Sequence, residues 1–135
     1  MNWVELCEDR SLQDLPYKIE LNRHGQIIMS PTRHMHGYFQ GEIAYLLKKL
    51  LPQGYVAVEC AVDTAEGTKV ADVTWSSPER FRINKEEFSC SVAPEICVEV
   101  WSPANDWDMM MEKRALYHAK GALEFWNCDE HGTLR

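Results

Sequence analysis

The stretch Ile96-Cys97-Val98-Glu99-Val100-Trp101 is apolar enough for a buried β-strand, yet it carries a glutamate near its centre. A second stretch, Val70-Ala71-Asp72-Val73-Thr74-Trp75, has the same character around an aspartate. An ionised carboxylate inside an apolar sheet costs several kcal/mol unless it is paired or binds a metal. Two such carboxylates therefore predict a functional site on these strands.

The segments around these two stretches predict an α/β fold. We expect an N-terminal arm over residues 1–16, a hairpin over 17–29 and a helix over 33–51. Three strands are expected over 55–62, 69–75 and 94–101, followed by a second helix over 106–120 and a last strand over 122–126. Residues 80–87 are expected to form a charged loop between the second and third of the three strands. This order predicts a mixed β-sheet with helices packed on it.

The length and composition are those of one globular domain: 135 residues, 45% hydrophobic and 26% charged. No run of 18 apolar residues and no signal-like start are present, so no membrane association and a cytoplasmic location are expected. The five cysteines include no Cys-x-x-Cys pair, which argues against a disulfide framework and a thiolate zinc site. The net charge of −7 opposes tight non-specific binding to nucleic acid.

Asp72 and Glu99 can reach one point if their strands are neighbours in the sheet. Mg²⁺ or Mn²⁺ at that point would take both carboxylates, a main-chain carbonyl and water, and would activate a water for attack on a phosphodiester. Lys113, on the second predicted helix, would position or help to deprotonate that water, or neutralise charge in the transition state. The set predicts metal-dependent phosphodiester cleavage.

Several landmarks, taken in order, resemble the Uma-two (Uma2) family of bacterial restriction endonucleases, which is placed in the PD-(D/E)XK nuclease superfamily. The landmarks are Gly25–Pro31, His36–Gln40, Ala71–Val73, Pro94–Pro103, Glu112–Lys113 with Tyr117, and Gly121–Trp126. The resemblance covers about residues 17–129. It implies a restriction-endonuclease-like core, a mixed β-sheet flanked by helices with an N-terminal β-hairpin, in a single domain over residues 1–135.

The resemblance also implies the roles of site residues. Asp72 and Glu99 would be the metal ligands, with Val100 as the source of the main-chain carbonyl. Trp101 stands where the Glu-x-Lys motif has its lysine, and Lys113 is the family's matching position on the following helix. The proline that precedes the aspartate in the superfamily motif is an alanine here, which removes no chemical group.

Three further residues have two interpretations each. His36 matches the family's histidine at the start of the first helix and would orient a phosphate or a water, or it is a structural or capping histidine. Glu42 would lie near the metal, as acidic residues on this helix do in the superfamily, or it is an exposed helix glutamate. Glu59, on the preceding strand, is a candidate for a supporting carboxylate. His34 and His36 lack a third ligand, so we expect no zinc site there.

Family members usually continue with further strands beyond the position of Arg135, so the C-terminus is short relative to the family. We therefore expect an exposed sheet edge, which a homodimer would cover.

The predicted function is that of a divalent-metal-dependent endonuclease acting on DNA. The alternative is a catalytically inactive, nuclease-like binding or assembly module, which the negative charge and the absence of a lysine at Trp101 favour. A small-molecule hydrolase that uses the same carboxylates is a third class. Stabilisation by a divalent ion that is lost in Asp72→Ala, without cleavage, would favour the binding module.

Overall fold

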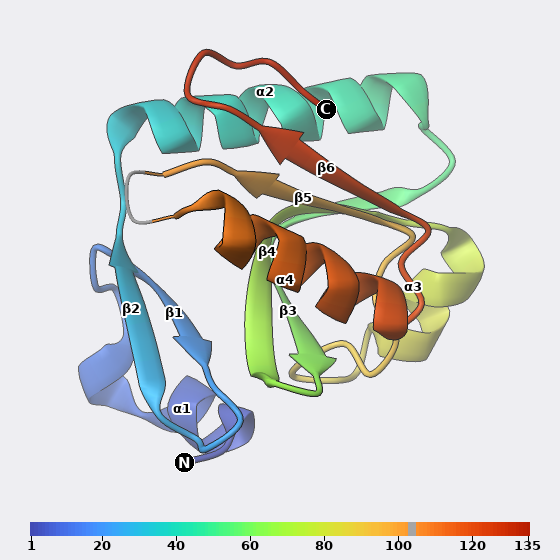
Figure 1. The fold of residues 1–135 in the computed structure, drawn as a ribbon. Coiled ribbons are helices and arrows are strands. Elements are labelled where there is room, and N and C mark those ends of the chain that lie inside the picture. The colour runs from blue at the N-terminus through green and yellow to red at the C-terminus, as the bar shows by residue number, and fades with distance from the viewer. Residues whose placement is uncertain (103–104) are drawn as a thin grey trace.

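The computed structural model describes residues 1–102 and 105–135. Its strands form two sheets, an antiparallel hairpin and a four-stranded sheet in the order β3-β4-β5-β6 (Figure 1). The strands are β1 (Tyr17–Leu21), β2 (Ile27–Pro31), β3 (Tyr55–Thr64), β4 (Gly67–Ser76), β5 (Ile96–Val100) and β6 (Glu124–Cys128). β3, β4 and β5 pair antiparallel, whereas β5 and β6 pair parallel, so the larger sheet is mixed as expected.

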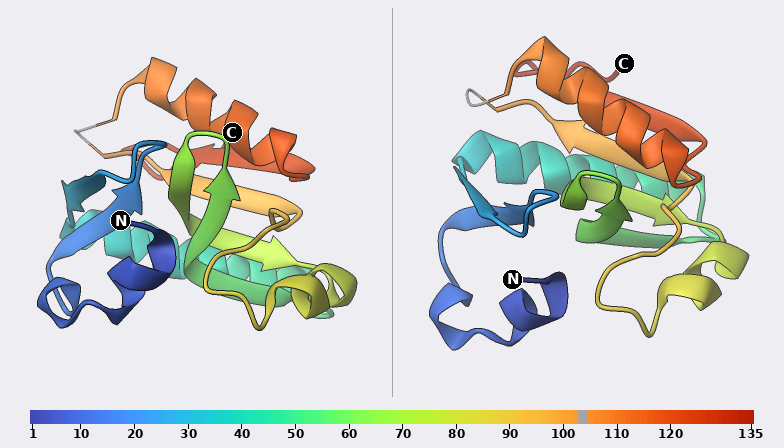
Figure 2. Two further views of the ribbon diagram at one scale, coloured as in Figure 1. Left: turned by 90° about the horizontal axis from the view of Figure 1, so that it is seen from below. Right: turned by 60° about the horizontal axis from the view of Figure 1, so that its bottom comes forward.

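Two long helices cover the two faces of the four-stranded sheet, α2 (His34–Leu50) on one and α4 (Trp107–Ala119) on the other (Figure 2). Because successive residues of a strand point to opposite faces, β5 serves both helices. Val98 packs with Leu47 of α2, whereas Cys97 packs with Tyr117 of α4. All five residues of β5 are buried, which explains why this strand is apolar at every position except Glu99.

The prediction of a charged loop over residues 80–87 is wrong at its start, because α3 (Pro78–Asn84) occupies this region. The Ser77 side chain accepts a hydrogen bond from the main-chain N–H of Arg80, and Pro78 stands in the first turn. This N-cap and proline favour a helix start whatever the charge of the residues that follow. The N-terminal arm contains two short helices, α1 (Trp3–Glu8) and η1 (Arg10–Leu12).

The edge of β6 carries part of the chain's own last residues. The main chain of Asn127 exchanges two hydrogen bonds of 2.9 Å with that of Arg135, and Cys128 forms a bridge to Leu134. All five cysteines are free, as expected. Among the described residues, no helix has the length and apolar character needed to cross a membrane.

Candidate active site

The two strand carboxylates lie on neighbouring strands. β4 and β5 pair antiparallel with Val73 opposite Val98, and one step along the same register brings Asp72 opposite Glu99. Both residues are only 1% exposed. The two carboxylates can therefore act on one point, as the sequence predicts.

A lysine from the hairpin bridges the two carboxylates. Lys18 of β1 places its Nζ 3.1 Å from Asp72 Oδ1 and 3.1 Å from Glu99 Oε2. Its side chain is 12% exposed. The site thus holds a cation between Asp72 and Glu99 that the sequence did not lead us to expect.

A second lysine and a third carboxylate adjoin this pair. Lys113 of α4 donates from Nζ to Glu99 Oε1 at 3.2 Å and to Glu20 Oε2 at 2.9 Å. Glu20, on β1, also accepts the main-chain N–H of Val70 at 2.6 Å, which anchors the hairpin to β4. The residues Lys18, Glu20, Asp72, Glu99 and Lys113 are called the charged cluster below.

Uncharged donors fix the orientation of the two central carboxylates. The Tyr117 hydroxyl of α4 donates to Glu99 Oε1 at 2.9 Å, and the main-chain N–H of Val100 donates to Asp72 Oδ2 at 2.7 Å. Each carboxylate therefore has a hydrogen-bond donor that does not depend on the position of either lysine. Such pre-organisation is what a ligand site for a metal requires.

The first turns of α2 reach Asp72 from the opposite side. His36 Nε2 lies 3.3 Å from Asp72 Oδ2, and Gln40 donates from Nε2 to the main-chain oxygen of Asp72 at 3.0 Å. Gln40 is four residues beyond His36, and Ile43 and Leu47 are three and seven residues beyond Gln40, so all four share one face of the helix, along which Ile43 and Leu47 make apolar contacts. Burial of this apolar face therefore also sets the position of His36.

Asp72 and Glu99 are equally buried, yet their pKa values shift in opposite directions. Burial disfavours the charged form of Asp72, but Lys18 and His36 outweigh it and hold the pKa of this carboxyl well below its usual range. Burial raises the pKa of Glu99 to about 7, although Lys113 and Lys18 act against it. Asp72 therefore stays ionised at neutral pH, whereas Glu99 exchanges its proton in this range.

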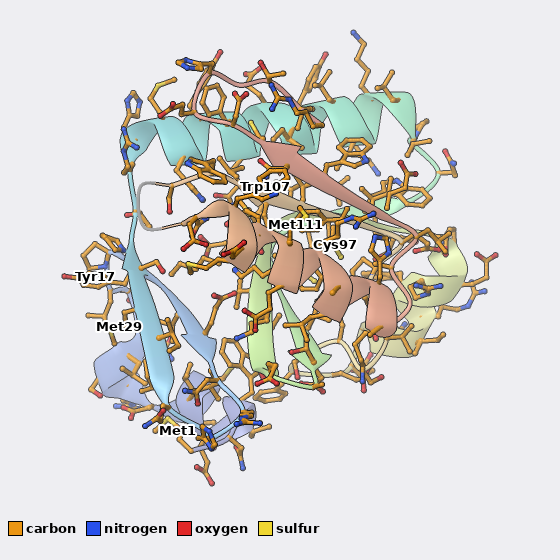
Figure 3. All side chains as sticks on the ribbon, in the orientation of Figure 1. Met1, Tyr17, Met29, Cys97, Trp107 and Met111 are labelled. Atoms are coloured by element: carbon orange, nitrogen blue, oxygen red, sulfur yellow. The ribbon has the colours of Figure 1, made fainter. Side chains whose placement is uncertain are left out.

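Four members of the charged cluster, Lys18, Glu20, Asp72 and Lys113, line a cavity of about 60 Å³ between the hairpin, α2 and the beginning of α4. The fifth member, Glu99, contacts both of these lysines. Figure 3 shows the side chains between the hairpin, where Tyr17 and Met29 are labelled, and α4, where Trp107 and Met111 are labelled. Val100, His36 and Glu59 also line this cavity. The structure therefore brings together Asp72, Glu99, Lys113, His36 and Val100 from the predicted site.

Glu42 is the predicted site residue that the structure does not bring to the cluster. Its side chain is exposed on α2, outside the described residues that line the cavity. Three residues of the site were missed from the sequence, namely Lys18, Glu20 and Tyr117. The alternation Lys18-Ile19-Glu20 puts both charges on one face of β1, but this pattern is equally typical of a solvated hairpin face.

The donor set fits a hard divalent cation that keeps several waters. The described residues hold no group of three or more His, Cys, Asp and Glu side chains arranged around an ion. Two carboxylates, one main-chain carbonyl and water are nevertheless a sufficient set for Mg²⁺. The position of the Lys18 ammonium between Asp72 and Glu99 indicates that a cation is accommodated there.

Comparisons with known proteins agree with this fold. The Uma2 family model, described as "Putative restriction endonuclease", matches residues 5–133. Among solved structures, a "putative nuclease" from Anabaena variabilis superposes with a TM-score of 0.73 at 18% sequence identity, covering 92% of this chain and 73% of that chain. At this identity the likeness shows the fold alone, and it confirms the expected fold class. The comparison with curated proteins gives no match.

Proposed function

The chain belongs to the Uma2 family of restriction-endonuclease-like proteins, and from this membership we propose that it is a divalent-metal-dependent endonuclease that hydrolyses phosphodiester bonds of DNA. The observation that carries the proposal is the buried pair Asp72 and Glu99 on β4 and β5, with Lys113 in contact with Glu99. A pair of buried carboxylates with pKa values shifted apart is typical of a catalytic site.

Asp72, Glu99 and the main-chain carbonyl of Val100 would hold Mg²⁺ or Mn²⁺. When bound, the ion would supply Lewis acidity toward a phosphoryl oxygen and toward a water. Tyr117 and the N–H of Val100 keep the two carboxylates in place through hydrogen bonds of 2.9 and 2.7 Å. These donors reduce the reorganisation that ligand binding would otherwise cost.

Lys113 is proposed as the catalytic lysine. Its Nζ lies 3.2 Å from Glu99 Oε1, so its ammonium is close enough to hold a water next to the carboxylates or to stabilise charge on the phosphate. Glu20, at 2.9 Å, holds this ammonium on the cavity side of α4. His36 is proposed as a positioning residue that acts through Asp72.

The alternative is a nuclease-like binding or assembly module without catalysis. The observation that favours it is that the charges of the cluster are paired with one another, since both lysines already contact carboxylates. The two functions differ in turnover, not in metal binding, so a cleavage assay separates them.

The test is cleavage of supercoiled plasmid and of single-stranded DNA at low salt with Mg²⁺, Mn²⁺ or EDTA, for the wild type and for Asp72→Ala, Glu99→Ala and Lys113→Ala. We expect metal-dependent cleavage that all three substitutions abolish. Cleavage that survives in Lys113→Ala alone would remove the role of this lysine. A wild type that binds the ion and cuts neither substrate would favour the binding module. Light scattering on the same samples tests the proposed homodimer.

A further inference from the structure

The Lys18 ammonium lies between the two carboxylates that are the proposed side-chain ligands of the metal ion. Its ammonium is equidistant, at 3.1 Å, from Asp72 Oδ1 and Glu99 Oε2. Each of these oxygens is one that a shared metal ion would use. The chain itself thus supplies a cation to the place where the ion would bind.

The ammonium and a divalent ion cannot both stay between these oxygens. Mg²⁺ binds carboxylate oxygens at about 2.0–2.1 Å, well inside the 3.1 Å contacts of Lys18. Two cations within a few ångströms of each other in a buried site repel strongly, because little water lies between them to screen the charges. Binding of the ion therefore requires the Lys18 ammonium to leave.

The structure offers a place for the displaced ammonium. A second cavity, of about 420 Å³, lies beside the first, between the hairpin and the N-terminal arm. Of the described residues, Lys18 and Glu59 line both cavities. The flexible four-carbon stem of a lysine can turn from one cavity to the other without movement of β1.

Glu59 is suited to receive that ammonium. Val58 pairs with Val73 and Cys60 with Ala71, so Glu59 stands at the register position of Asp72 on the neighbouring strand. Its side chain is exposed, and its backbone has a φ of 50°, in the left-handed region that a glutamate within a strand rarely adopts. Backbone strain of this kind is concentrated at functional sites.

We propose that Lys18 is an internal counter-cation of the metal site, which a divalent ion displaces from Asp72 and Glu99 toward Glu59. This inference rests on the proposed function, because it takes Asp72 and Glu99 as the ligands of the ion. Lys18 is in this view a positioning residue. It keeps the two carboxylates together in the absence of the ion and sets the ion concentration at which the site fills.

The test is equilibrium binding of Mn²⁺ alone, measured by electron paramagnetic resonance of the free ion, on the wild type, Lys18→Met and Glu59→Gln. Lys18→Met should bind Mn²⁺ about tenfold or more tightly, since the competing charged hydrogen bonds are gone. The matched control is Lys49→Met, which removes the same charge from an exposed position on α2 and should leave the affinity unchanged.

Glu59→Gln supplies a second test, which compares its effect on Mn²⁺ binding in the presence and in the absence of Lys18. It should weaken Mn²⁺ binding when Lys18 is present and have little effect in the Lys18→Met background, because the displaced ammonium is its partner. An equal loss in both backgrounds would show that Glu59 acts on the ion directly and would overturn its assigned role.

The two hypotheses fail in different ways. Unchanged or weaker Mn²⁺ binding in Lys18→Met, with binding still lost in Asp72→Asn, would overturn the role of Lys18 and leave the metal site in place. No binding by the wild type or by any variant at millimolar Mn²⁺ would overturn the metal site itself, and with it the proposed function.

Discussion

The four-stranded sheet has two buried regions that lie side by side but are held together differently. The apolar core under α2 contains the residues Ile43, Leu47, Val73, Trp75, Ile96, Val98, Val100 and Cys128. The charged cluster begins one residue further along the same strands, at Asp72 beside Val73 and Glu99 beside Val98. Burial of apolar surface stabilises the first region, whereas the second must offset the desolvation of its charges with ion pairs.

This difference indicates what each region is for. A buried ion-pair network is often no more stable than apolar residues of similar volume, so its presence is poorly explained by stability. The three carboxylates of the charged cluster, with two ammonium groups between them, also leave an excess of negative charge. We therefore expect substitutions to separate stability from activity along this boundary.

The largest expected effect is a loss of activity without a loss of stability. Glu99→Gln leaves the pairs Lys18–Asp72 and Lys113–Glu20 intact and removes the excess carboxylate. We expect metal-dependent cleavage to fall by roughly 10²- to 10³-fold, the order seen when a group that stabilises the transition state is removed. The melting temperature in EDTA should be unchanged or higher. Full activity in this variant would place the chemistry elsewhere.

The next effect is the reverse, a loss of stability with activity retained. Leu47 is 1% exposed, so Leu47→Ala should lower the free energy of unfolding by about 2–5 kcal/mol in urea denaturation. Cleavage per folded molecule should stay near the wild-type rate. The matched control is Leu50→Ala on the same helix, where the side chain is 68% exposed and the change should be below about 0.5 kcal/mol.

The sequence predicts a feature of these two regions when the pattern behind it lies within one helix or strand, and does not predict it when it depends on how two elements pack together. The helical spacing of Ile43 and Leu47 predicts α2, and a carboxylate in an apolar strand singles out Asp72 and Glu99, because both signals lie within one element. The contacts of Lys18 depend on how the hairpin packs across β4, which no spacing within the hairpin specifies. A lysine in an amphipathic strand is thus indistinguishable from a solvated one until the tertiary structure is known.

A third prediction concerns pH, with a smaller effect. Burial raises the pKa of Glu99 from 4.5 to about 7, so between these values the folded chain binds a proton that the unfolded chain has released. Stability in EDTA should therefore fall as pH rises through this window, by about 1 kcal/mol per pH unit for this group. Urea denaturation at pH 5, 6, 7 and 8 should show this slope in the wild type up to about pH 7 and a levelling above it, and a flatter dependence in Glu99→Gln. Equal slopes would contradict the shifted pKa of Glu99.

The smallest expected effect is at Glu42, which shares α2 with His36 but is exposed. Glu42→Ala should leave the cleavage rate within about twofold and change stability by less than about 0.5 kcal/mol. His36→Ala is the informative comparison, because His36 contacts Asp72 and its loss should lower the cleavage rate further. A larger loss in Glu42→Ala than in His36→Ala would reverse the assignment of these two residues.

The most direct test of the charged cluster as a metal-dependent nuclease site is to titrate Mn²⁺ against the wild type while bound ion and plasmid cleavage are measured in the same samples. We expect cleavage to rise with the occupancy of a site that contains Asp72, and both signals to be lost in Asp72→Asn while the protein stays folded. Cleavage that persists in EDTA, or saturated binding without cleavage, would contradict this function.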